Sequence, residues 1–300
     1  MSTATNPVTP ASPATRMPTT VGVIGGGRMG AGIAQVFATL GSAVTIAESH
    51  DSEAALDRVH TGLSRAHERG ALNGRDPHTI AERVSTVDAV EHLPGDLALV
   101  IEAVPEQPSL KIEVLAAAEK VVGDTAVIAS NTSSLSIAEL GAALRLPGRF
   151  LGLHFFNPVP ASSLVEIVRS PDTSDDTVAA ARAWVRALGK SEVVVNDAPG
   201  FATSRLGVCL GLEAIRMVEE GVASPADIDR AMELGYRHPM GPLRSTDLVG
   251  LDVRLAIADH LARELGDRFV APKLLRDKVS AGELGRKSGQ GFYDWKAGAR

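Results

Sequence analysis

A glycine-rich stretch near the start of the chain constrains the fold more than any other feature. Residues 21–24 (VGVI) predict a short buried β-strand, and residues 31–40 continue as a mostly apolar helix. Between them, three glycines fall at the spacing G-x-G-x-x-G, which allows a tight turn, the approach of a pyrophosphate and close packing of helix on strand. The residues of this loop that are predicted to bind a dinucleotide are Gly25, Gly27, Arg28, Met29 and Gly30.

The second predicted strand, residues 43–47 (AVTIA), ends at Glu48. An acidic residue at this point is placed to accept hydrogen bonds from the adenosine ribose hydroxyls, and it would repel a ribose phosphate. Without the glycine loop, Glu48 would be an ordinary surface residue at a strand end. With the loop, it favours NAD over NADP as the cofactor.

Strands go on alternating with helices along the first two thirds of the chain. Strands are expected at 97–101, 126–129 and 191–195, and helices at 51–72, 110–122 and 175–188. This alternation predicts an α/β, Rossmann-type doubly wound sheet that binds its ligand at the carboxyl ends of its strands. The polar run 130–136 follows such a strand, and capping of the helix expected at 137–144 needs only one of its side chains. The others, from Asn131 to Ser134, remain for a ligand.

Two further strands are expected at 150–156 (FLGLHFF) and 164–168 (LVEIV), joined by a proline-rich turn. If they pair as neighbours, His154 and Glu166 come close together. A lone histidine on an apolar strand is more often a satisfied core residue, and the residues alone leave that alternative open. A histidine with a nearby glutamate beside a nicotinamide site is better explained as a general base with its orienting carboxylate.

Strand signals stop beyond residues 196–200 (NDAPG), which are interpreted as a domain boundary. Helices are expected at 202–220, 225–234, 245–265 and 272–281. The expected organisation is a disordered tail at 1–19, a Rossmann-type domain at 20–197 and a smaller all-helical domain at 198–300. The first of these helices is apolar nearly all round, so it is expected to form the core of its domain, with Cys209 buried and inert. Gly207 and Gly211 on one of its faces would let another helix approach closely.

Composition argues against several classes of function. A net charge of −6 over 300 residues disfavours general nucleic-acid binding and offers no basic stripe to a membrane surface. No apolar run reaches the length of a membrane span, and the N-terminal residues lack the apolar core of a signal peptide. The single cysteine cannot form an internal disulfide, which is compatible with a reducing compartment, and a cytoplasmic location is expected. No metal site is expected.

Longer runs distributed over residues 21–295 closely resemble the L-3-hydroxyacyl-CoA dehydrogenase family, and most of all its short, stand-alone 3-hydroxybutyryl-CoA dehydrogenase type. These runs are GVIGGGRMGAGIAQ, SNTSSLSI, GLHFFNPVP, PGFATSRL, HPMGPLRSTDLVGLD and GRKSGQGFYDW. The resemblance implies an NAD-binding domain followed by a helical domain for the substrate and for homodimer formation. It also implies reversible oxidation of an L-3-hydroxyacyl-CoA to the 3-ketoacyl-CoA, so that an acyl-CoA is the expected partner.

The same resemblance assigns roles in the reaction to four residues. His154 would take the hydroxyl proton while the hydride leaves carbon 3 for the nicotinamide, and Glu166 would hold and polarise His154. Ser133 would hydrogen-bond the reacting oxygen. Asn157 would position both the substrate and the nicotinamide.

Further positions match the family's cofactor and substrate contacts. Glu106, Lys111 and Lys287 correspond to residues that contact NAD. Arg69 falls where the family has a basic residue for the phosphates of coenzyme A. On its own, the basic cluster at residues 65–75 to which Arg69 belongs would be a solvated helix face.

Two departures from the family pattern concern the acyl group. Ser204 stands where the run PGF-x-x-N-R usually has asparagine, so the contact to the acyl portion is lost or passes through water. As an alternative, Ser204 merely caps or begins the helix. Ser162 and Ser163 replace the usual Met-Lys after NPVP-x. Both changes bear on acyl-chain preference more than on the type of reaction.

Other functions remain open at the level of sequence. A dehydrogenase of a small free hydroxy acid, such as gulonate or carnitine, would share the glycine loop and the HFFNP run. A non-catalytic NAD-binding protein is disfavoured because His154, Glu166 and Ser133 occur together. A β-hydroxyacid dehydrogenase with a catalytic lysine is disfavoured because the run PGFATSRL contains none.

Overall fold

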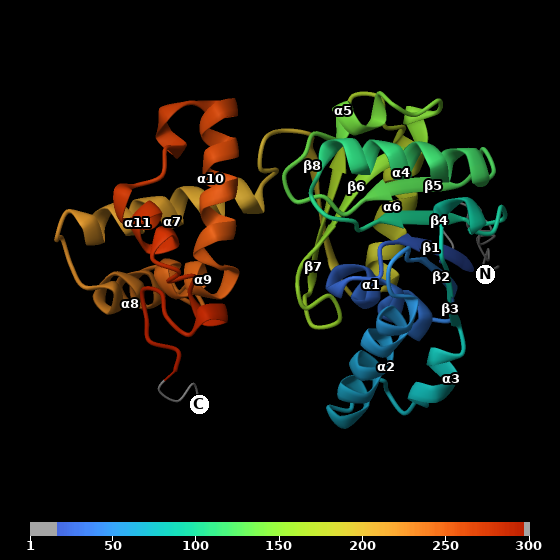
Figure 1. Ribbon diagram of the computed structural model, residues 1–300, viewed down its shortest axis with the longest axis horizontal. Helices are drawn as coiled ribbons and strands as arrows, with labels where there is room; N and C mark the ends of the chain where they lie inside the picture. Colours follow the sequence, from blue (N-terminus) through green and yellow to red (C-terminus); the bar gives the residue numbers. More distant parts are fainter. Residues whose placement is uncertain (1–16, 297–300) are drawn as a thin grey trace, which may run out of the picture. The chain divides into compact units, whose positions relative to one another are not determined.

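The structure, a computed structural model, describes residues 17–296. The chain divides after Asp197 into two compact units, and the second begins at Ala198 (Figure 1). The tail expected at residues 1–19 lies almost entirely outside the described residues.

The first unit is built on an eight-stranded sheet in the order β3-β2-β1-β4-β5-β6-β7-β8. Its strands are β1 (Thr20–Ile24), β2 (Ala43–Ala47), β3 (Val84–Val87), β4 (Leu99–Glu102), β5 (Val127–Ser130), β6 (Phe150–Phe155), β7 (Leu164–Arg169) and β8 (Ser191–Asn196). All neighbours run parallel except β6 and β7, which are antiparallel. The predicted doubly wound sheet is therefore confirmed, with one reversal that the alternation of elements did not specify.

Helices cover both faces of this sheet. They are α1 (Arg28–Thr39), α2 (Ser52–Glu68), α3 (Pro77–Ala81), α4 (Pro108–Val121), α5 (Ile137–Gly141) and α6 (Asp175–Ala187). The main apolar core packs α1, α2 and α6 against side chains that include Leu151 and Leu153. A Cβ on Gly152, between those two, would lie 3.0 Å from Ile137 of α5, so α5 packs on the opposite face.

Two elements of the first unit were not predicted. Helix α3 is short, and Asp76 caps its N-terminus by accepting hydrogen bonds from the N–H groups of His78 and Thr79. Strand β3 (VSTV) has only Val84 fully buried. An edge strand this short, with polar residues in it, gives no clear apolar run.

Among the residues described, the second unit contains helices, short 3₁₀ turns and two isolated β-bridges, Gly285–Gln290 and Gln290–Asp294, but no β-strand. Its helices are α7 (Thr203–Glu219), α8 (Pro225–Gly235), α9 (Pro242–Val249), α10 (Leu251–Leu265) and α11 (Lys273–Ser280) (Figure 1). The single helix expected at 245–265 is wrong. Gly250, at φ +106°, separates α9 from α10, because this conformation ends a helix and favours glycine.

Helix α7 corrects a second expectation. Val208, Leu212 and Ile215 lie in the apolar core of the unit, but Leu206 is 70% exposed and Cys209 is also exposed. The prediction of a buried Cys209 was therefore wrong. The neighbouring helices pack against one side of α7, and its opposite side stays open although it is apolar.

The run GQGFYDW near the end of the chain is fixed by hydrogen bonds to one buried carboxylate, that of Asp247 in α9. Asp247 accepts hydrogen bonds from the N–H groups of Phe292 and Tyr293, each at 2.9 Å, and from Nε1 of Trp295 at 2.8 Å. A Cβ on Gly291 would lie 2.3 Å from Oδ1 of Asp247. The glycine in GQGFYDW is therefore required for this close approach.

Candidate active site

The glycine loop has the geometry of a phosphate-binding turn. Gly25 has φ +98°, and Gly27 forms the N-cap of α1, which has no side-chain cap. A Cβ on Gly30 would lie 1.9 Å from the carbonyl oxygen of Gly25, so strand and helix approach too closely for a side chain. A Cβ on Gly27 would meet nothing within 4 Å. The N–H groups and positive dipole end of α1 therefore face open space, which fits a dinucleotide pyrophosphate.

Glu48 is tied to this loop at the end of β2. Its Oε2 accepts a hydrogen bond from the N–H of Gly26 at 2.7 Å, and its Oε1 accepts one from the N–H of His50 at 3.0 Å. Burial opposes ionisation of the carboxyl, but the backbone N–H donors of His50 and Gly26 outweigh it and lower the pKa of Glu48. The group is therefore anionic at neutral pH, beside the turn where a ribose would lie.

An ion-pair network whose members Lys111 and Glu102 are buried lies behind the polar run that follows β5. The ammonium group of Lys111, in α4, is 2.6 Å from Oε1 of Glu102 and 3.2 Å from Oε2 of Glu106. It also donates to the carbonyl of Val104 at 3.2 Å. Glu102, fully buried at the end of β4, accepts a second hydrogen bond from Ser130 at 2.5 Å. The network thus joins the carboxyl ends of β4 and β5.

Glu106 organises the residues after β5. One of its oxygens, Oε1, accepts hydrogen bonds from the hydroxyl of Thr132 at 2.6 Å and from the N–H groups of Ser133 and Ser134 at 2.9 and 3.2 Å. Burial opposes ionisation, but the charge of Lys111 and these donors outweigh it and lower the pKa of Glu106. The carboxylate stays ionised at neutral pH and fixes the backbone that carries Ser133.

Lys111 was predicted to contact NAD. Its side chain is 1% exposed and lies behind Glu106, so in this conformation it positions Glu106. A direct contact with the cofactor stays a prediction.

The side chains of the polar run have protein partners. Ser136 is the residue of the run that caps α5, because its hydroxyl accepts a hydrogen bond from the N–H of Glu139. Asn131 accepts a hydrogen bond from the N–H of Phe155 at 2.8 Å, which ties the run to the end of β6. Thr132, Ser133 and Ser134 donate to Glu106, so the ligand expected at this run stays a prediction.

His154 and Glu166 face each other across the antiparallel pair of β6 and β7. The ring atom Nδ1 lies 2.8 Å from Oε2 of Glu166, and the carboxylate accepts this hydrogen bond. Glu166 is fully buried, and His154 is 6% exposed. The ring of Phe156 packs on the imidazole with 4.3 Å between ring centroids. The predicted proximity is confirmed, and the pairing fixes one tautomer of the imidazole.

A cavity of about 840 Å³ brings three of the predicted residues together. It lies between α1, α2 and the loop after β6, and Arg28, Arg69 and Asn157 all line it. Arg58 and Arg65, at spacings of one to three turns from Arg69 along α2, line it too. The loop that forms its other wall is held by Lys190, which donates to the carbonyls of Val159 and Ser162. This basic cavity suits an anionic ligand.

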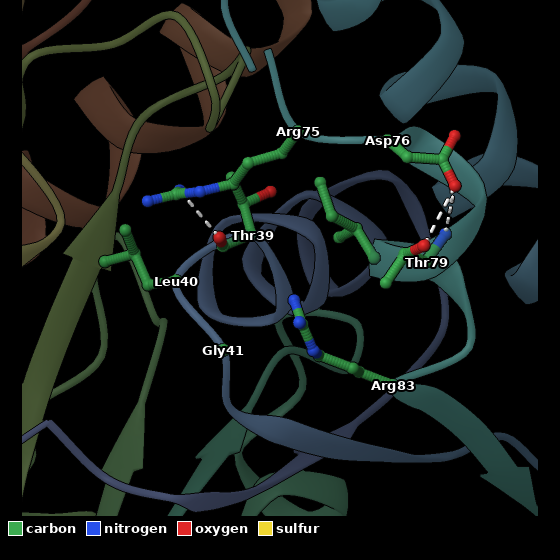
Figure 2. A pocket seen from close by; sticks show the side chains of 8 residues that line it. Thr39, Leu40, Gly41, Arg75, Asp76, Thr79 and Arg83 are labelled. Carbon is green, nitrogen blue, oxygen red and sulfur yellow. Dashed lines mark hydrogen bonds between the residues drawn. The ribbon is translucent and has the colours of Figure 1, made fainter. Parts of the chain in front are cut away.

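Arg75 does not line that cavity, although it belongs to the same basic cluster in the sequence as Arg65 and Arg69. It donates to the carbonyl of Thr39 at 2.9 Å, beside the C-terminus of α1 (Figure 2). Arg83 donates to the carbonyl of Ala38 at 3.2 Å. Both guanidinium groups bind carbonyls of the last turn of α1, where their positive charge interacts favourably with the negative end of the helix dipole.

Ser204 and Lys287 belong to the second unit. Ser204 lies in the first turn of α7, and it is partly buried. Lys287 follows α11 and forms an ion pair with Asp252 of α10, with 2.5 Å between Nζ and Oδ2.

Three features of the site were not predicted from the sequence. Glu102 lies one residue beyond the predicted strand 97–101, and a buried acid at the end of an apolar strand was the available signal. Arg58 lies on the same face of α2 as Arg65 and Arg69, so helical spacing could have grouped the three. The hydrogen bonds from Lys190 to the carbonyls of Val159 and Ser162 join segments far apart in the sequence, so no local sequence pattern predicts them.

The fold and the glycine loop define an NAD-binding oxidoreductase, and comparison with known proteins identifies the family. Residues 20–198 match the model described as "3-hydroxyacyl-CoA dehydrogenase, NAD binding domain", and residues 200–295 match "3-hydroxyacyl-CoA dehydrogenase, C-terminal domain". The chain belongs to the 3-hydroxyacyl-CoA dehydrogenase family. Among residues 17–296, no helix is long and apolar enough to cross a membrane.

Named relatives cover nearly the whole chain. The 3-hydroxybutyryl-CoA dehydrogenase of Mycobacterium tuberculosis is 45% identical over 282 residues, which are 92% of this chain and 98% of the relative. That of Clostridioides difficile is 38% identical over 91% of this chain and 98% of the relative. The crystal structure of (S)-3-hydroxybutyryl-CoA dehydrogenase PaaH1 from Ralstonia eutropha superposes with a TM-score of 0.87 at 39% identity, over 93% of this chain and 99% of that chain.

Two single substitutions separate cofactor binding from folding in the glycine loop. Gly27→Ala should fold normally, because the new methyl meets nothing, but should weaken NADH binding at least about tenfold because the methyl obstructs the pyrophosphate. Gly30→Ala should lower the free energy of unfolding by roughly 1–3 kcal/mol, because its methyl collides with Gly25. Fluorescence titration with NADH and urea unfolding measure the two effects. Unchanged NADH affinity in Gly27→Ala would contradict the assigned pyrophosphate site.

Proposed function

We propose that this chain catalyses the NAD-dependent, reversible oxidation of an L-3-hydroxyacyl-CoA to the 3-ketoacyl-CoA. The observation that carries the proposal is the buried His154–Glu166 pair in a chain of the 3-hydroxyacyl-CoA dehydrogenase family. The names of the relatives favour a short acyl group such as 3-hydroxybutyryl. When bound, the nicotinamide supplies the acceptor of a hydride from carbon 3, or the donor in the reverse direction.

His154 moves the proton of the reaction. Glu166 accepts the hydrogen bond of Nδ1, so the opposite ring nitrogen, Nε2, is assigned to the substrate hydroxyl. In the oxidation, Nε2 takes the hydroxyl proton, and the negative charge of Glu166 stabilises the imidazolium that forms. In the reduction, the same nitrogen returns the proton to the carbonyl oxygen.

Ser133 and Asn157 orient the reacting groups. The Ser133 hydroxyl is proposed to hydrogen-bond the reacting oxygen, and Glu106 fixes the backbone at this residue through the N–H groups of Ser133 and Ser134. Asn157 is proposed to position substrate and nicotinamide from the loop that Lys190 holds. Ser204, from the second unit, is proposed to contact the acyl portion.

The remaining predicted residues bind the cofactor and coenzyme A in this proposal. Gly25, Gly27, Arg28, Met29 and Gly30 form the pyrophosphate turn, and Glu48 accepts hydrogen bonds from the ribose. Glu106, Lys111 and Lys287 contribute to the NAD site. Arg69 binds a phosphate of coenzyme A, which the basic cavity beside α2 supports.

We also propose that the chain forms a homodimer through its second unit and acts in the cytoplasm. The second unit exposes a set of large apolar side chains: Leu206, Val222, Leu234, Tyr236, Val249, Val253 and Val270. A second copy of the chain would bury such a surface. The same set was not apparent from the sequence, because exposure depends on which helix faces are packed.

The reaction is tested first by its substrates. NADH oxidation should occur with acetoacetyl-CoA and not with free acetoacetate, because the phosphates of coenzyme A contribute to binding. NADPH should replace NADH poorly, because Glu48 is anionic at the ribose. Spectrophotometric assays at 340 nm measure all three. Turnover of acetoacetate alone would favour a free hydroxy acid as substrate, and equal use of NADPH would contradict the role of Glu48.

The histidine–glutamate pair is tested by substitution. His154→Ala and Glu166→Gln should each lower kcat by about 10²–10⁴-fold, which is the usual contribution of a positioned general base. NADH affinity should stay within about twofold of the parent, because neither side chain belongs to the cofactor site. A variant that loses NADH binding together with activity would indicate misfolding and would undercut the assigned role.

The assembly is tested in solution. Light scattering should give the mass of a dimer, and Leu206→Glu should shift the protein toward the monomer because it buries a charge at the contact. Ile112→Glu, at an exposed position of α4, is the matched control and should leave the dimer intact. A monomeric parent protein at micromolar concentration would contradict the proposal.

A further inference from the structure

An unpaired guanidinium group lies inside the helical unit. Arg254, in α10, is 8% exposed, and its guanidinium group forms no hydrogen bond or ion pair with any residue that the structure describes. Its Nε is completely buried without a partner. Burial of a charged group is costly unless the group is paired, so an arginine in this state lacks the anion that would normally accompany it.

The guanidinium group lies along α7 and points toward the start of that helix. A Cβ on Gly211 would lie 3.9 Å from Nε of Arg254, whereas a Cβ on Gly207 would lie 3.2 Å from Nη1 and 3.9 Å from Nη2. The terminal nitrogens are therefore at the Gly207 end. Ser204 lies one turn before Gly207 on the same face of α7. The two glycines thus provide the groove that takes the arginine.

Among residues 198–296, no acidic side chain forms an ion pair with Arg254. Asp252, the acid nearest in sequence, is ion-paired with Lys287. Burial lowers the pKa of Arg254 to about 10, with no opposing contribution from a carboxylate, so the group is still cationic at neutral pH. The first turn of α7, a helix of 17 residues, adds the positive end of its dipole. Two positive centres therefore converge on one place.

We infer that Arg254, beside the first turn of α7, binds a carboxylate at the end of the substrate's acyl chain. The inference rests on the proposed function, which assigns Ser204 to the acyl portion. The substrate class is then a 3-hydroxyacyl-CoA that carries a distal carboxylate. Arginine suits this ligand because its planar group donates two parallel hydrogen bonds to a carboxylate. Serine at position 204 is shorter than asparagine and leaves more room for the acyl chain.

The test compares two thioesters of equal chain length. 3-Oxoadipyl-CoA ends in a carboxylate, and 3-oxohexanoyl-CoA ends in a methyl group. With NADH, kcat/KM should be roughly tenfold or more higher for 3-oxoadipyl-CoA, which corresponds to one charge-assisted contact. Arg254→Gln should abolish this preference by lowering kcat/KM for 3-oxoadipyl-CoA alone. Arg263→Gln, at an exposed position of the same helix, should retain it.

Thermal unfolding supplies a second readout that does not depend on turnover. Arg254→Met should raise the melting temperature or leave it unchanged, because the substitution removes a buried charge that has no partner. A large decrease would show that a partner within the protein already satisfies Arg254, and it would overturn the inference. The variants must also bind NADH like the parent.

The outcomes separate this inference from the proposed function. Activity with acetoacetyl-CoA but no preference for the carboxylate overturns the inference and leaves the dehydrogenase reaction intact. A preference that survives Arg254→Gln overturns it as well, because the carboxylate is then bound elsewhere. No turnover of any thioester would instead contradict the proposed function.

Discussion

The hydrogen bond between His154 and Glu166 depends on the one reversal in the sheet. In an all-parallel sheet, β7 would follow β6 only after a crossover, and no short turn could bring two consecutive strands side by side. Here β6 and β7 run antiparallel, and the register places His154 opposite Glu166. The carboxylate is fully buried, so the hydrogen bond from His154 helps to satisfy a polar group that water does not reach. Fold and proton transfer are therefore linked through one strand pair.

A second constraint acts at the carboxyl ends of the parallel strands. Lys111 binds Glu102 and Glu106, and Glu106 in turn holds the backbone at Ser133. Two carboxylates share one ammonium group, so the arrangement is stable only because hydrogen bonds from Ser130 and Thr132 satisfy the remaining oxygens. The backbone at Ser133, the serine proposed to bind the reacting oxygen, is thus positioned by this ion-pair network. The same edge of the sheet carries the glycine loop and Glu48.

Local patterns in the sequence predicted much of this architecture. The glycine loop, the strand at 43–47 and the helix that begins at Asp175 were found because their apolar periods and capping residues are contained in short windows. The proximity of His154 and Glu166 followed from one assumption about strand pairing. These features depend on residues that are close together in the sequence, so local patterns predict them.

The features that escaped prediction depend on packing between distant segments. Strand β3 is short and partly polar, so only its pairing with β2 reveals it. Gly250 divides two helices whose apolar pattern runs on without a break, because the signal lies in the backbone angle and not in the side chains. Cys209 lies in an apolar run of the sequence, but in the structure it is exposed on the unpacked side of α7. The buried guanidinium group of Arg254 can be recognised only from the packing of α7, α9 and α10 against one another.

In the proposed reaction, this chain moves a hydride between the nicotinamide and carbon 3 of an acyl thioester. This transfer can be followed with NADH deuterated at C4 and acetoacetyl-CoA as substrates and mass spectrometry of the product. We expect the deuterium of one C4 face to appear at carbon 3 of 3-hydroxybutyryl-CoA, and we expect His154→Ala to form this product much more slowly. Product without deuterium at carbon 3, or NADH consumption with no hydroxyacyl-CoA formed, would contradict the proposed reaction.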